Sequence, residues 1–143
     1  MKLSQTAEYA LRAIVWLADQ GDTPSTTAEI SRGTRIPPGY LSKVLQTLVR
    51  EGLIRAQRGR GGGFNLARST EQLNILDVIN AVDPLVPMEH CPLGYGSHVP
   101  GLCPLHSRLQ QAFSLFENAL RETRISDLLS SSPKKQCLCV ERQ

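Results

Sequence analysis

A chain of 143 residues that is 41% hydrophobic can bury one ordinary core, and we expect one compact unit with an appendage. The first residues carry no apolar signal region, and no apolar run approaches the roughly 20 residues that span a bilayer. These features exclude a membrane protein and predict the cytoplasm. In a reducing cytosol the four cysteines are expected to be ligands or redox sensors rather than structural disulfides.

The formal net charge of +3 hides an uneven distribution. Residues 32–68 hold eight basic side chains and one acidic side chain, which give +7, and the remaining eight basic and twelve acidic side chains give −4. Such a local excess is attracted by a DNA phosphate backbone through counterion release. A membrane surface would also require an amphipathic basic helix with bulky apolar residues opposite, and the sequence contains none.

The first expected elements are two helices. Ser4 can cap the first, Gly21 lies past its end, and its apolar residues recur at the spacing of a core helix: Ala7, Ala10, Leu11, Ile14, Leu17 and Ala18. Residues 26–29 form a capping box for a short second helix, which Gly33 and then Pro37-Pro38 are expected to stop.

A third helix is expected between Gly39 and Gly52. Its inner face is apolar and consists of Leu41, Val44, Leu45 and Leu48. A recognition helix must offer hydrogen-bonding side chains to DNA while its opposite face anchors to a core. The candidate DNA-contacting residues are Tyr40, Ser42, Lys43, Gln46 and Arg50. The alternative is the solvated face of an ordinary amphipathic helix, which we would favour if this helix stood alone.

The helix does not stand alone, because a polar hairpin is expected directly after it. Residues 53–58 are predicted as a strand and residues 64–66 as its return, joined by a glycine-rich turn. Arg58 and Arg60 lie at the tip, where Gly61 and Gly62 permit close approach to a narrow minor groove. The glycine run precedes a strand and matches no nucleotide-binding motif. Helices and hairpin together predict a winged helix-turn-helix DNA-binding domain over residues 1–83, in a fold that is mainly α with a small β-hairpin wing.

Asn74 is predicted to cap a further helix with the inner face Ile75, Val78, Ile79 and Val82, which stops near Pro84. Residues 84–104 form a loop rich in proline, glycine, cysteine and histidine. A narrow apolar stripe with a period near 3.5 then follows at Leu105, Leu109, Ala112, Phe116 and Ala119. We expect a dimerisation helix over residues 105–130 and a flexible tail over residues 131–143.

The loop holds candidate metal ligands. Cys91 and Cys103 are twelve positions apart, and His106 follows three residues later, so that the last two are expected to face one another across one helical turn. Two thiolates and an imidazole suit an iron–sulfur cluster or zinc. The alternative is that the cysteines pack as small hydrophobic residues and the histidine is solvated. Cys137 and Cys139 follow two lysines, and they form either a reactive or metal-binding pair or part of a disordered end.

Several motifs along the chain match one family. They are Met1-Lys2-Leu3-Ser4 with residues 8–12, Ile36-Pro37 with residues 40–45, Leu53-Ile54 with residues 58–64, residues 75–82, and Cys103-Pro104-Leu105-His106. On these motifs, over almost its whole length, the chain resembles the Rrf-two family of bacterial transcription regulators, which includes the IscR, NsrR and RirA types. The resemblance implies a winged-helix regulator of DNA whose last long helix mediates dimerisation.

Members of this family that sense iron, nitric oxide or redox state hold an iron–sulfur cluster through three cysteines and a further ligand. The resemblance implies Cys91 and Cys103 as the first and third cysteines and His106 as the further ligand of the IscR type. The middle position is Ser97, whose hydroxyl is a poor iron ligand at neutral pH compared with a thiolate.

A different group would therefore have to complete the ligand set, or no cluster binds. The candidates are His98 and the partner subunit's Glu8, which matches a position from which some family members donate a carboxylate. The alternative for Glu8 is an ordinary surface charge that favours the first turn of its helix. A mixed set of two cysteines, histidine and carboxylate would favour a 2Fe-2S cluster over a 4Fe-4S cluster.

The sequence thus predicts a homodimeric transcriptional repressor that places two recognition helices in successive major grooves of a near-palindromic operator. An iron–sulfur cluster is expected to control its DNA affinity. The alternative is a cluster-free member that uses a Cys91/Cys103 thiol–disulfide switch, zinc or a protein partner. An enzyme with a cysteine nucleophile has little support, because the chain has no nucleophile elbow, two-histidine metal motif or phosphate loop.

Overall fold

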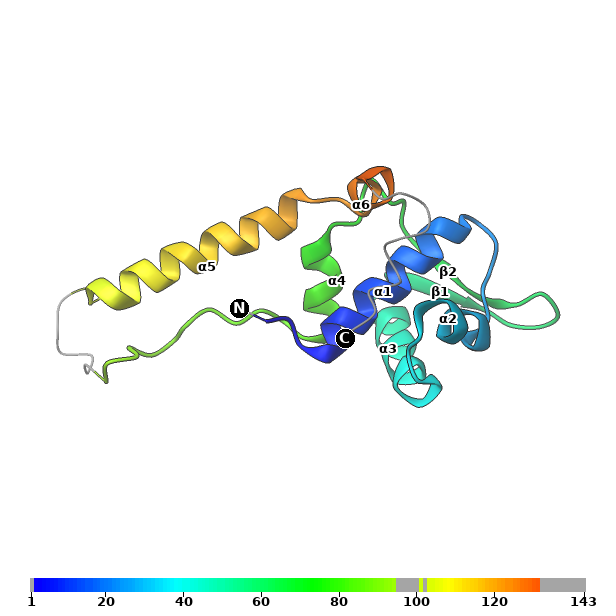
Figure 1. Ribbon diagram of the computed structural model, residues 1–143, viewed down its shortest axis with the longest axis horizontal. Coiled ribbons are helices and arrows are strands. Elements are labelled where there is room, and N and C mark those ends of the chain that lie inside the picture. Colours follow the sequence, from blue (N-terminus) through cyan, green and yellow to red (C-terminus); the bar gives the residue numbers. More distant parts are fainter. Residues whose placement is uncertain (1, 95–100, 102, 132–143) are drawn as a thin grey trace, which may run out of the picture.

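The computed structural model describes residues 2–94, 101 and 103–131. In chain order its elements are α1 (Gln5–Gln20), α2 (Thr27–Thr34), α3 (Pro38–Arg50), β1 (Ile54–Gln57), β2 (Gly63–Leu66), α4 (Ile75–Val82), α5 (Pro104–Glu122) and α6 (Ile125–Ser131). We call α1–α4, the hairpin and α6 the head, and we call α5 with residues 85–94 the arm. The head is compact, and the arm extends from it (Figure 1). The described residues confirm a mainly helical fold with a two-stranded hairpin.

The starts of the first two helices follow the sequence signals. Ser4 caps α1, and its side chain accepts a hydrogen bond from the N–H of Ala7. Thr26 and Glu29 form the expected reciprocal capping box at the start of α2. Both caps satisfy backbone N–H groups that have no partner inside the helix.

Gly33 does not stop α2, contrary to the prediction. It lies inside the helix, which ends at Thr34, and Arg35 then adopts a left-handed conformation with φ of 58°. A Cβ atom at Gly33 would lie 2.1 Å from the ring of Trp16 in α1. Glycine is therefore present because α2 packs closely on that ring.

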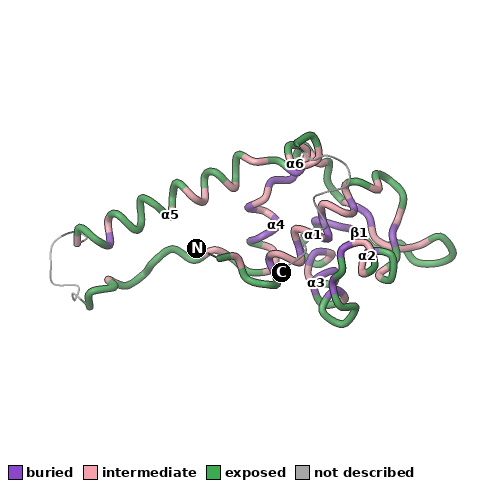
Figure 2. Tube along the Cα trace, in the orientation of Figure 1, coloured by how far each residue is buried: buried purple, intermediate pink, exposed green. Residues whose placement is uncertain are grey.

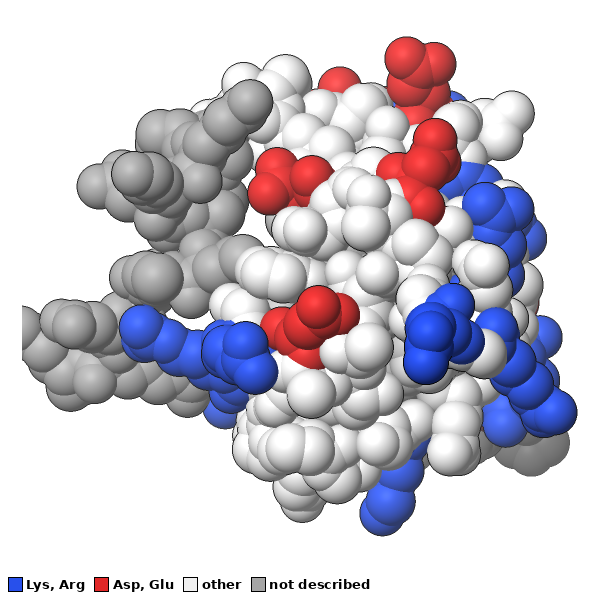
Figure 3. Space-filling model, turned by 90° about the vertical axis from the view of Figure 1, so that its right-hand side faces the viewer, with Lys and Arg blue, Asp and Glu red and all other residues white. Residues whose placement is uncertain are grey.

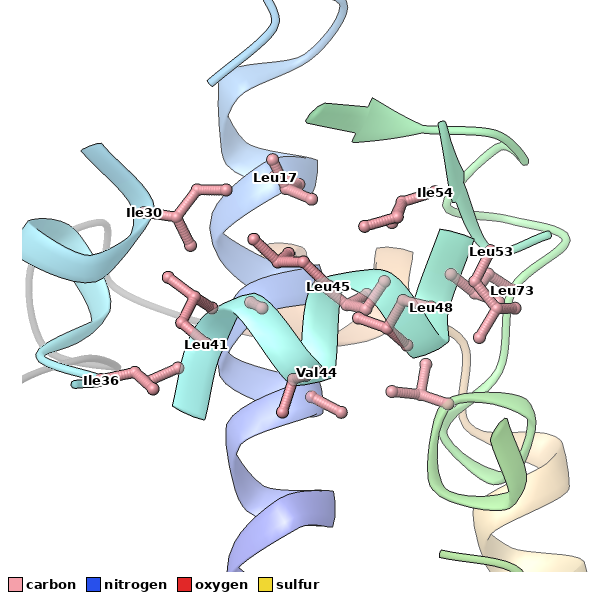
Figure 4. Packing of buried hydrophobic residues seen from close by; sticks show 14 of the residues in the cluster. Leu17, Ile30, Ile36, Leu41, Val44, Leu45, Leu48, Leu53, Ile54 and Leu73 are labelled. Carbon is pink, nitrogen blue, oxygen red and sulfur yellow. The ribbon is translucent and has the colours of Figure 1, made fainter. Parts of the chain in front are cut away.

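Helix α3 anchors to the centre of the head as predicted. Its four inner residues are at most 4% exposed: Leu41, Val44, Leu45 and Leu48. Figure 4 shows that their side chains pack with Leu17 of α1 and Ile30 of α2. Pro38 occupies the first turn of α3, where its missing N–H leaves no hydrogen bond unmade. The opposite face of α3 is thus held outward by a rigid interior.

The hairpin is antiparallel and pairs Ile54 with Leu66 and Gln57 with Gly63. Its base belongs to the core, because Leu53 and Ile54 are each only 2% exposed. The sequence predicts a polar hairpin, and that description is wrong at its base. The loop between α1 and α2 also joins the hairpin through paired backbone hydrogen bonds of 2.9 and 2.8 Å between Ser25 and Phe64. The exposed part of the hairpin therefore extends from a base that is packed in the core of the head.

Helix α4 begins after Asn74 as predicted, but its buried face is rotated from the expected one. Leu76 is 4% exposed and was not predicted to be buried, whereas Ile75 and Val82 are only half-buried. Leu76, Val78 and Ile79 form the buried set. An eight-residue apolar helix offers nearly continuous hydrophobicity, so its periodicity alone does not define one face.

The helix expected over residues 105–130 is two helices. The chain leaves helical geometry at Thr123 and Arg124, where Ile75 donates a backbone hydrogen bond to the Thr123 carbonyl and Asn74 forms a bridge with Arg124. Helix α6 then returns to the head, where Ile125 is fully buried and its N–H bonds to the Leu73 carbonyl. Residues 125–131 therefore complete the core of the head rather than extend the arm.

Burial separates the two regions (Figure 2). The buried cluster lies entirely in the head, and His106 is the buried residue of α5. Over the described ranges, no helix combines the length and apolar character that a membrane span requires.

Candidate nucleic-acid interface and cysteine pair

The outer face of α3 carries exposed polar side chains. Lys43, Gln46 and Arg50 are exposed, and Ser42 is half-buried. The hydroxyl of Ser42 donates to the Pro38 carbonyl at 3.0 Å, within its own helix. In the described part of the chain, the side chains of Lys43 and Gln46 make no hydrogen bond or ion pair with protein groups. They therefore stand ready to bond to an external partner.

Tyr40 is 59% exposed and is braced by α1. Its ring makes an edge contact with the ring of Tyr9, with centroids 6.2 Å apart and an interplanar angle of 70°. Gln5 donates to the Tyr9 hydroxyl at 2.9 Å, and the Arg12 guanidinium lies 5.7 Å from the Tyr9 ring centroid. Tyr9 thus supports the first turn of α3, a role that sequence reasoning missed because α1 is spaced as a plain core helix.

The wing tip is a tight glycine turn. The N–H of Gly62 donates to the Gly59 carbonyl at 3.0 Å, and Gly61 has a φ of +75°. A Cβ at Gly62 would lie 2.3 Å from the Gln57 carbonyl oxygen. These positions therefore require glycine for the turn itself. Arg58 and Arg60 are exposed on it.

At the base of the wing, Arg55 is held by a buried amide. Its Nε donates to Oδ1 of Asn65 at 2.9 Å, and Nδ2 of Asn65 donates to the Asp22 carbonyl at 3.4 Å. Asn65 is 5% exposed, so its amide is fixed between the two strands and the loop that follows α1. The contact between Arg55 and Asn65 follows from the cross-strand register, which is not visible in the sequence of a single strand.

The basic residues of the segment 32–68 keep most of their charge unneutralised. Of the eight, only Arg50 has an ion pair among the described residues, with Glu51 at 3.4 Å. Viewed from the wing end, many of the lysine and arginine side chains run along the right-hand side of the molecule, others lie at the lower left and the bottom, and the visible carboxylates lie at the top and the centre (Figure 3). An unneutralised basic surface attracts phosphate groups over distances of about 10 Å.

Cys91 and Cys103 lie together. Their sulfur atoms are 3.3 Å apart, well beyond the roughly 2.05 Å of a disulfide bond, so they are two thiols in contact. Both side chains are half-buried. Cys103 caps α5, because its sulfur accepts a hydrogen bond from the backbone N–H of His106 at 3.3 Å. Cys103 and His106 therefore meet across the first turn of α5 as expected, but through the backbone N–H of His106 and not through its imidazole.

The imidazole of His106 points elsewhere. Its Nε2 lies 3.3 Å from the carbonyl oxygen of Met88, and the residue is 7% exposed. The described residues contain no group of three or more histidine, cysteine, aspartate or glutamate side chains arranged to hold a metal. Of the expected ligands, the structure therefore brings together the sulfurs of Cys91 and Cys103, and the His106 imidazole is turned away from them toward Met88.

The remaining candidate ligands are placed as follows. Glu8 lies in the first turn of α1, and its carboxylate is 3.9 Å from the Arg12 guanidinium. Ser97 and His98 lie outside the described residues, as do Cys137 and Cys139.

An exposed polar recognition helix, packed beside a basic glycine-tipped hairpin, defines the class of winged-helix DNA-binding proteins. The comparisons with known proteins agree. The family model of Rrf2, described as iron-dependent transcriptional regulators, matches residues 3–131. The chain therefore belongs to the Rrf2 family of transcriptional regulators, and the family resemblance read from the sequence is confirmed.

Individual relatives have similar lengths and are regulators rather than enzymes. The transcriptional regulator IscR of Cereibacter sphaeroides is 34% identical over 137 residues, which cover 92% of this chain and 88% of that protein. Among solved structures, IscR of T. potens has a TM-score of 0.79 at 22% identity and covers 98% of this chain and 94% of its own. CymR, the global cysteine regulator of B. subtilis, has a TM-score of 0.77 at 21% identity, with coverages of 92% and 98%. These two structures confirm the fold.

Proposed function

We propose that the protein is a homodimeric, sequence-specific repressor that reads a near-palindromic operator. Two copies of α3 enter successive major grooves, and the wings reach the flanking minor grooves. The observation that carries this proposal is the free polar face of α3, with Lys43 and Gln46, beside the exposed Arg58 and Arg60 of the wing. A regulator of this kind acts on the chromosome, so its expected compartment is the cytoplasm.

The proposed dimer forms through α5. The apolar stripe predicted from the sequence is largely exposed, with Leu105 at 41% and Leu109 at 38%, and Phe116 is half-buried. A long helix with an exposed apolar stripe gains stability when it pairs with a second helix. A second copy of the same helix is the simplest partner, because it matches the two-fold symmetry of a palindromic operator.

For the sensor we propose control by an iron–sulfur cluster, with Cys91 and Cys103 as sulfur ligands. The two adjacent sulfurs support this ligand pair. His106 and either the partner subunit's Glu8 or His98 would complete a mixed set, for which His106 must turn from the Met88 carbonyl. A bound cluster would supply an electron-transfer centre that also reacts with nitric oxide. The mixed ligands favour the 2Fe-2S form.

The second candidate is a cluster-free switch, favoured by the same 3.3 Å separation. The two thiols can form a disulfide by losing two protons and two electrons to an oxidant such as an organic hydroperoxide, which is reduced to an alcohol and water. Shortening the contact to a bond would pull residue 91 toward the start of α5. In either form, a coupling of about 1 to 3 kcal/mol between loop and DNA site would change operator affinity from several-fold to about a hundredfold.

The visible spectrum of anaerobically prepared protein, with iron and sulfide analysis, tests the sensor. A brown solution whose bands are lost in Cys91→Ala supports the cluster. A colourless protein that contains no iron after anaerobic reconstitution rejects it and leaves the thiol pair, while a colourless protein that contains zinc indicates a zinc site.

Duplex binding tests the DNA-reading half. Lys43→Ala should weaken operator binding, and it should relax sequence preference if Lys43 reads a base. Lys2→Ala removes the same charge from an exposed position before α1 and should have little effect. Equal affinity and preference in Lys43→Ala and wild type would show that Lys43 is misassigned.

Arg60→Ala tests the wing. Its loss should be largest for operators whose flanks have a narrow A·T-rich minor groove, since such grooves concentrate negative potential. Equal losses on all flanks would indicate a plain phosphate contact instead. A wild-type protein that binds no duplex even at low salt would end the proposal as a whole.

A further inference from the structure

A second basic feature lies at the base of the wing, away from the tip. A pocket of about 470 Å³ is formed there by the end of α1 with the turn after it, by Arg55 of β1, and by the end of β2 with the residues that follow it, 66–70. Neither the recognition residues of α3 nor the arginines of the wing tip line it.

One of its cations is fixed in place. The hydrogen bond from Nε of Arg55 to the buried Asn65 amide orients the guanidinium, and Asn65 is itself tied to the Asp22 carbonyl. Only the Nε edge is used by this contact, so the remaining N–H groups of the guanidinium are available for a ligand. A preoriented arginine loses less conformational entropy on binding than a freely rotating one.

The second cation of the pocket is Arg68, which follows β2 and is exposed. Among the residues that the structure describes, neither Arg55 nor Arg68 has a carboxylate within the 4.0 Å of an ion pair, although Asp22 also lines the pocket. Two guanidinium groups therefore share one hollow with a single carboxylate. Ser69 and Thr70 line the same wall and add hydroxyl groups that can donate to an anion.

We propose that this pocket binds a phosphate-type oxyanion between the Arg55 and Arg68 guanidinium groups. Guanidinium forks match the oxygen geometry of phosphate and can donate two parallel hydrogen bonds. The phosphate has two possible sources with the same chemistry. It belongs either to the backbone of bound DNA, which would extend the proposed DNA contact beyond α3 and the wing tip, or to a free phosphate-bearing molecule.

The first experiment uses inorganic phosphate and the full chain without DNA. Thermal unfolding is followed as potassium phosphate replaces potassium chloride at constant ionic strength and pH. Binding of free phosphate predicts a saturable rise of the unfolding midpoint, because a ligand that binds only the folded state stabilises it in proportion to its occupancy. Arg68→Gln should abolish this rise. A rise without saturation, equal in all variants, is the general effect of an excluded anion and does not count as binding.

Arg68→Gln is the primary variant because its side chain makes no hydrogen bond or ion pair among the described residues, so the fold should survive. Arg55→Gln is the second variant and also loses the Asn65 contact. The matched control is Arg108→Gln, which removes the same charge at the start of α5, at the opposite end of the molecule from the wing (Figure 1).

The second experiment uses a short duplex selected by the wild-type protein from a random pool. If the phosphate belongs to DNA, Arg68→Gln and Arg55→Gln each weaken binding and reduce the slope of log affinity against log salt by about 0.9 per lost contact. Arg108→Gln should leave that slope unchanged.

A saturable phosphate response of the wild type that the two pocket variants lose supports the site and identifies free phosphate as the source. A salt slope that is reduced in those two variants alone supports the site and identifies DNA as the source. If both variants match wild type in both experiments, the pocket binds no oxyanion and the inference is wrong. A wild-type protein that binds no duplex would remove the proposed function, and the phosphate titration alone would then decide this site.

Discussion

The head and the arm differ in how much of their apolar side-chain surface is buried. In the head, fifteen buried side chains form one cluster that draws on α1, α2, α3, β1, α4 and α6. In the arm, α5 buries only His106 and exposes Leu105, Leu109 and Leu115. Among the described residues, the head buries its apolar side chains internally, whereas α5 leaves three leucines exposed.

This difference assigns separate tasks to the two regions. A rigid head holds α3 and the wing in fixed relation, which base recognition requires. The arm, which carries the cysteine pair at the start of α5, is the part whose geometry can change without disturbing the core of the head. In the proposed dimer, a signal at the cysteines would therefore alter the spacing of the two heads while each head stays intact.

The largest effect is expected on dimer affinity, from a substitution in α5 that leaves the head unchanged. If α5 pairs with a second copy as proposed, Leu109→Asp would bury a carboxylate in the apolar seam between the two helices, at a cost of several kcal/mol, or roughly a thousandfold in dimer affinity. Light scattering after size exclusion should then give the monomer mass, while the helical content of the head persists.

Gln110→Asp is the matched control, because it adds the same charge at the next, exposed polar position of α5. It should remain a dimer. A dimeric Leu109→Asp protein, or equal dissociation of both variants, would show that the seam does not run along this stripe.

A slightly smaller effect is expected in the head from Ile125→Ala. Ile125 is fully buried in α6 and packs into the head cluster, so truncation should cost about 2 to 5 kcal/mol of unfolding free energy. Urea unfolding at one fixed protein concentration measures this cost. Leu93→Ala, at a 54% exposed position of the arm, should change stability by less than about 0.5 kcal/mol. Equal losses of unfolding free energy in Ile125→Ala and Leu93→Ala would show that the head and the arm do not differ in this way.

The same example shows where sequence reasoning reached its limit. The caps at Ser4, Thr26 and Asn74 and the inner face of α3 depend on residues within one turn of each other, and the sequence predicted them. The break after Glu122 depends on backbone pairing between Arg124 and Asn74, which are fifty residues apart. No local pattern marks such a pairing, so α6 was assigned to the arm.

The candidate sites divide in the same way. Exposure of Lys43, Gln46 and Arg60 follows from helical and hairpin periodicity, and the sequence indicated it. The orientation of the His106 ring toward Met88 depends on how the loop folds back on α5. The bracing of Tyr40 by Tyr9 likewise depends on packing between α1 and α3. Both are tertiary contacts, which spacing along the chain does not encode.

A smaller effect in the head is expected from Gly33→Ala. The added Cβ would meet the Trp16 ring at 2.1 Å, and overpacking of this kind costs about 1 to 3 kcal/mol. Alanine's better helix propensity returns at most about 1 kcal/mol. Urea unfolding should show a net loss, and the fluorescence of Trp16 should change. Gly39→Ala, which has nothing within 4 Å of its added Cβ, should show no loss. A stable Gly33→Ala protein would mean that α2 can shift freely on α1.

The smallest expected effect concerns the exposed capping box of α2. The backbone N–H of Thr26 and then its hydroxyl bond to the Glu29 carboxylate and hold the pKa of Glu29 below its ordinary value of 4.5. A depressed folded-state pKa contributes stability that is complete above the unfolded-state pKa and is lost as pH falls through the folded-state pKa. Glu29→Ala should therefore be slightly less stable than wild type at pH 7, and the difference should shrink as the pH falls below about 4.5. Glu71→Ala removes a carboxylate from another exposed position of the head and is the matched control for the loss of a surface charge. The mass of the proposed dimer should not change in either variant, because the box lies at the start of α2 in the head. A difference in unfolding free energy between Glu29→Ala and wild type that persisted into acid would show that the carboxylate charge is not what stabilises this helix start.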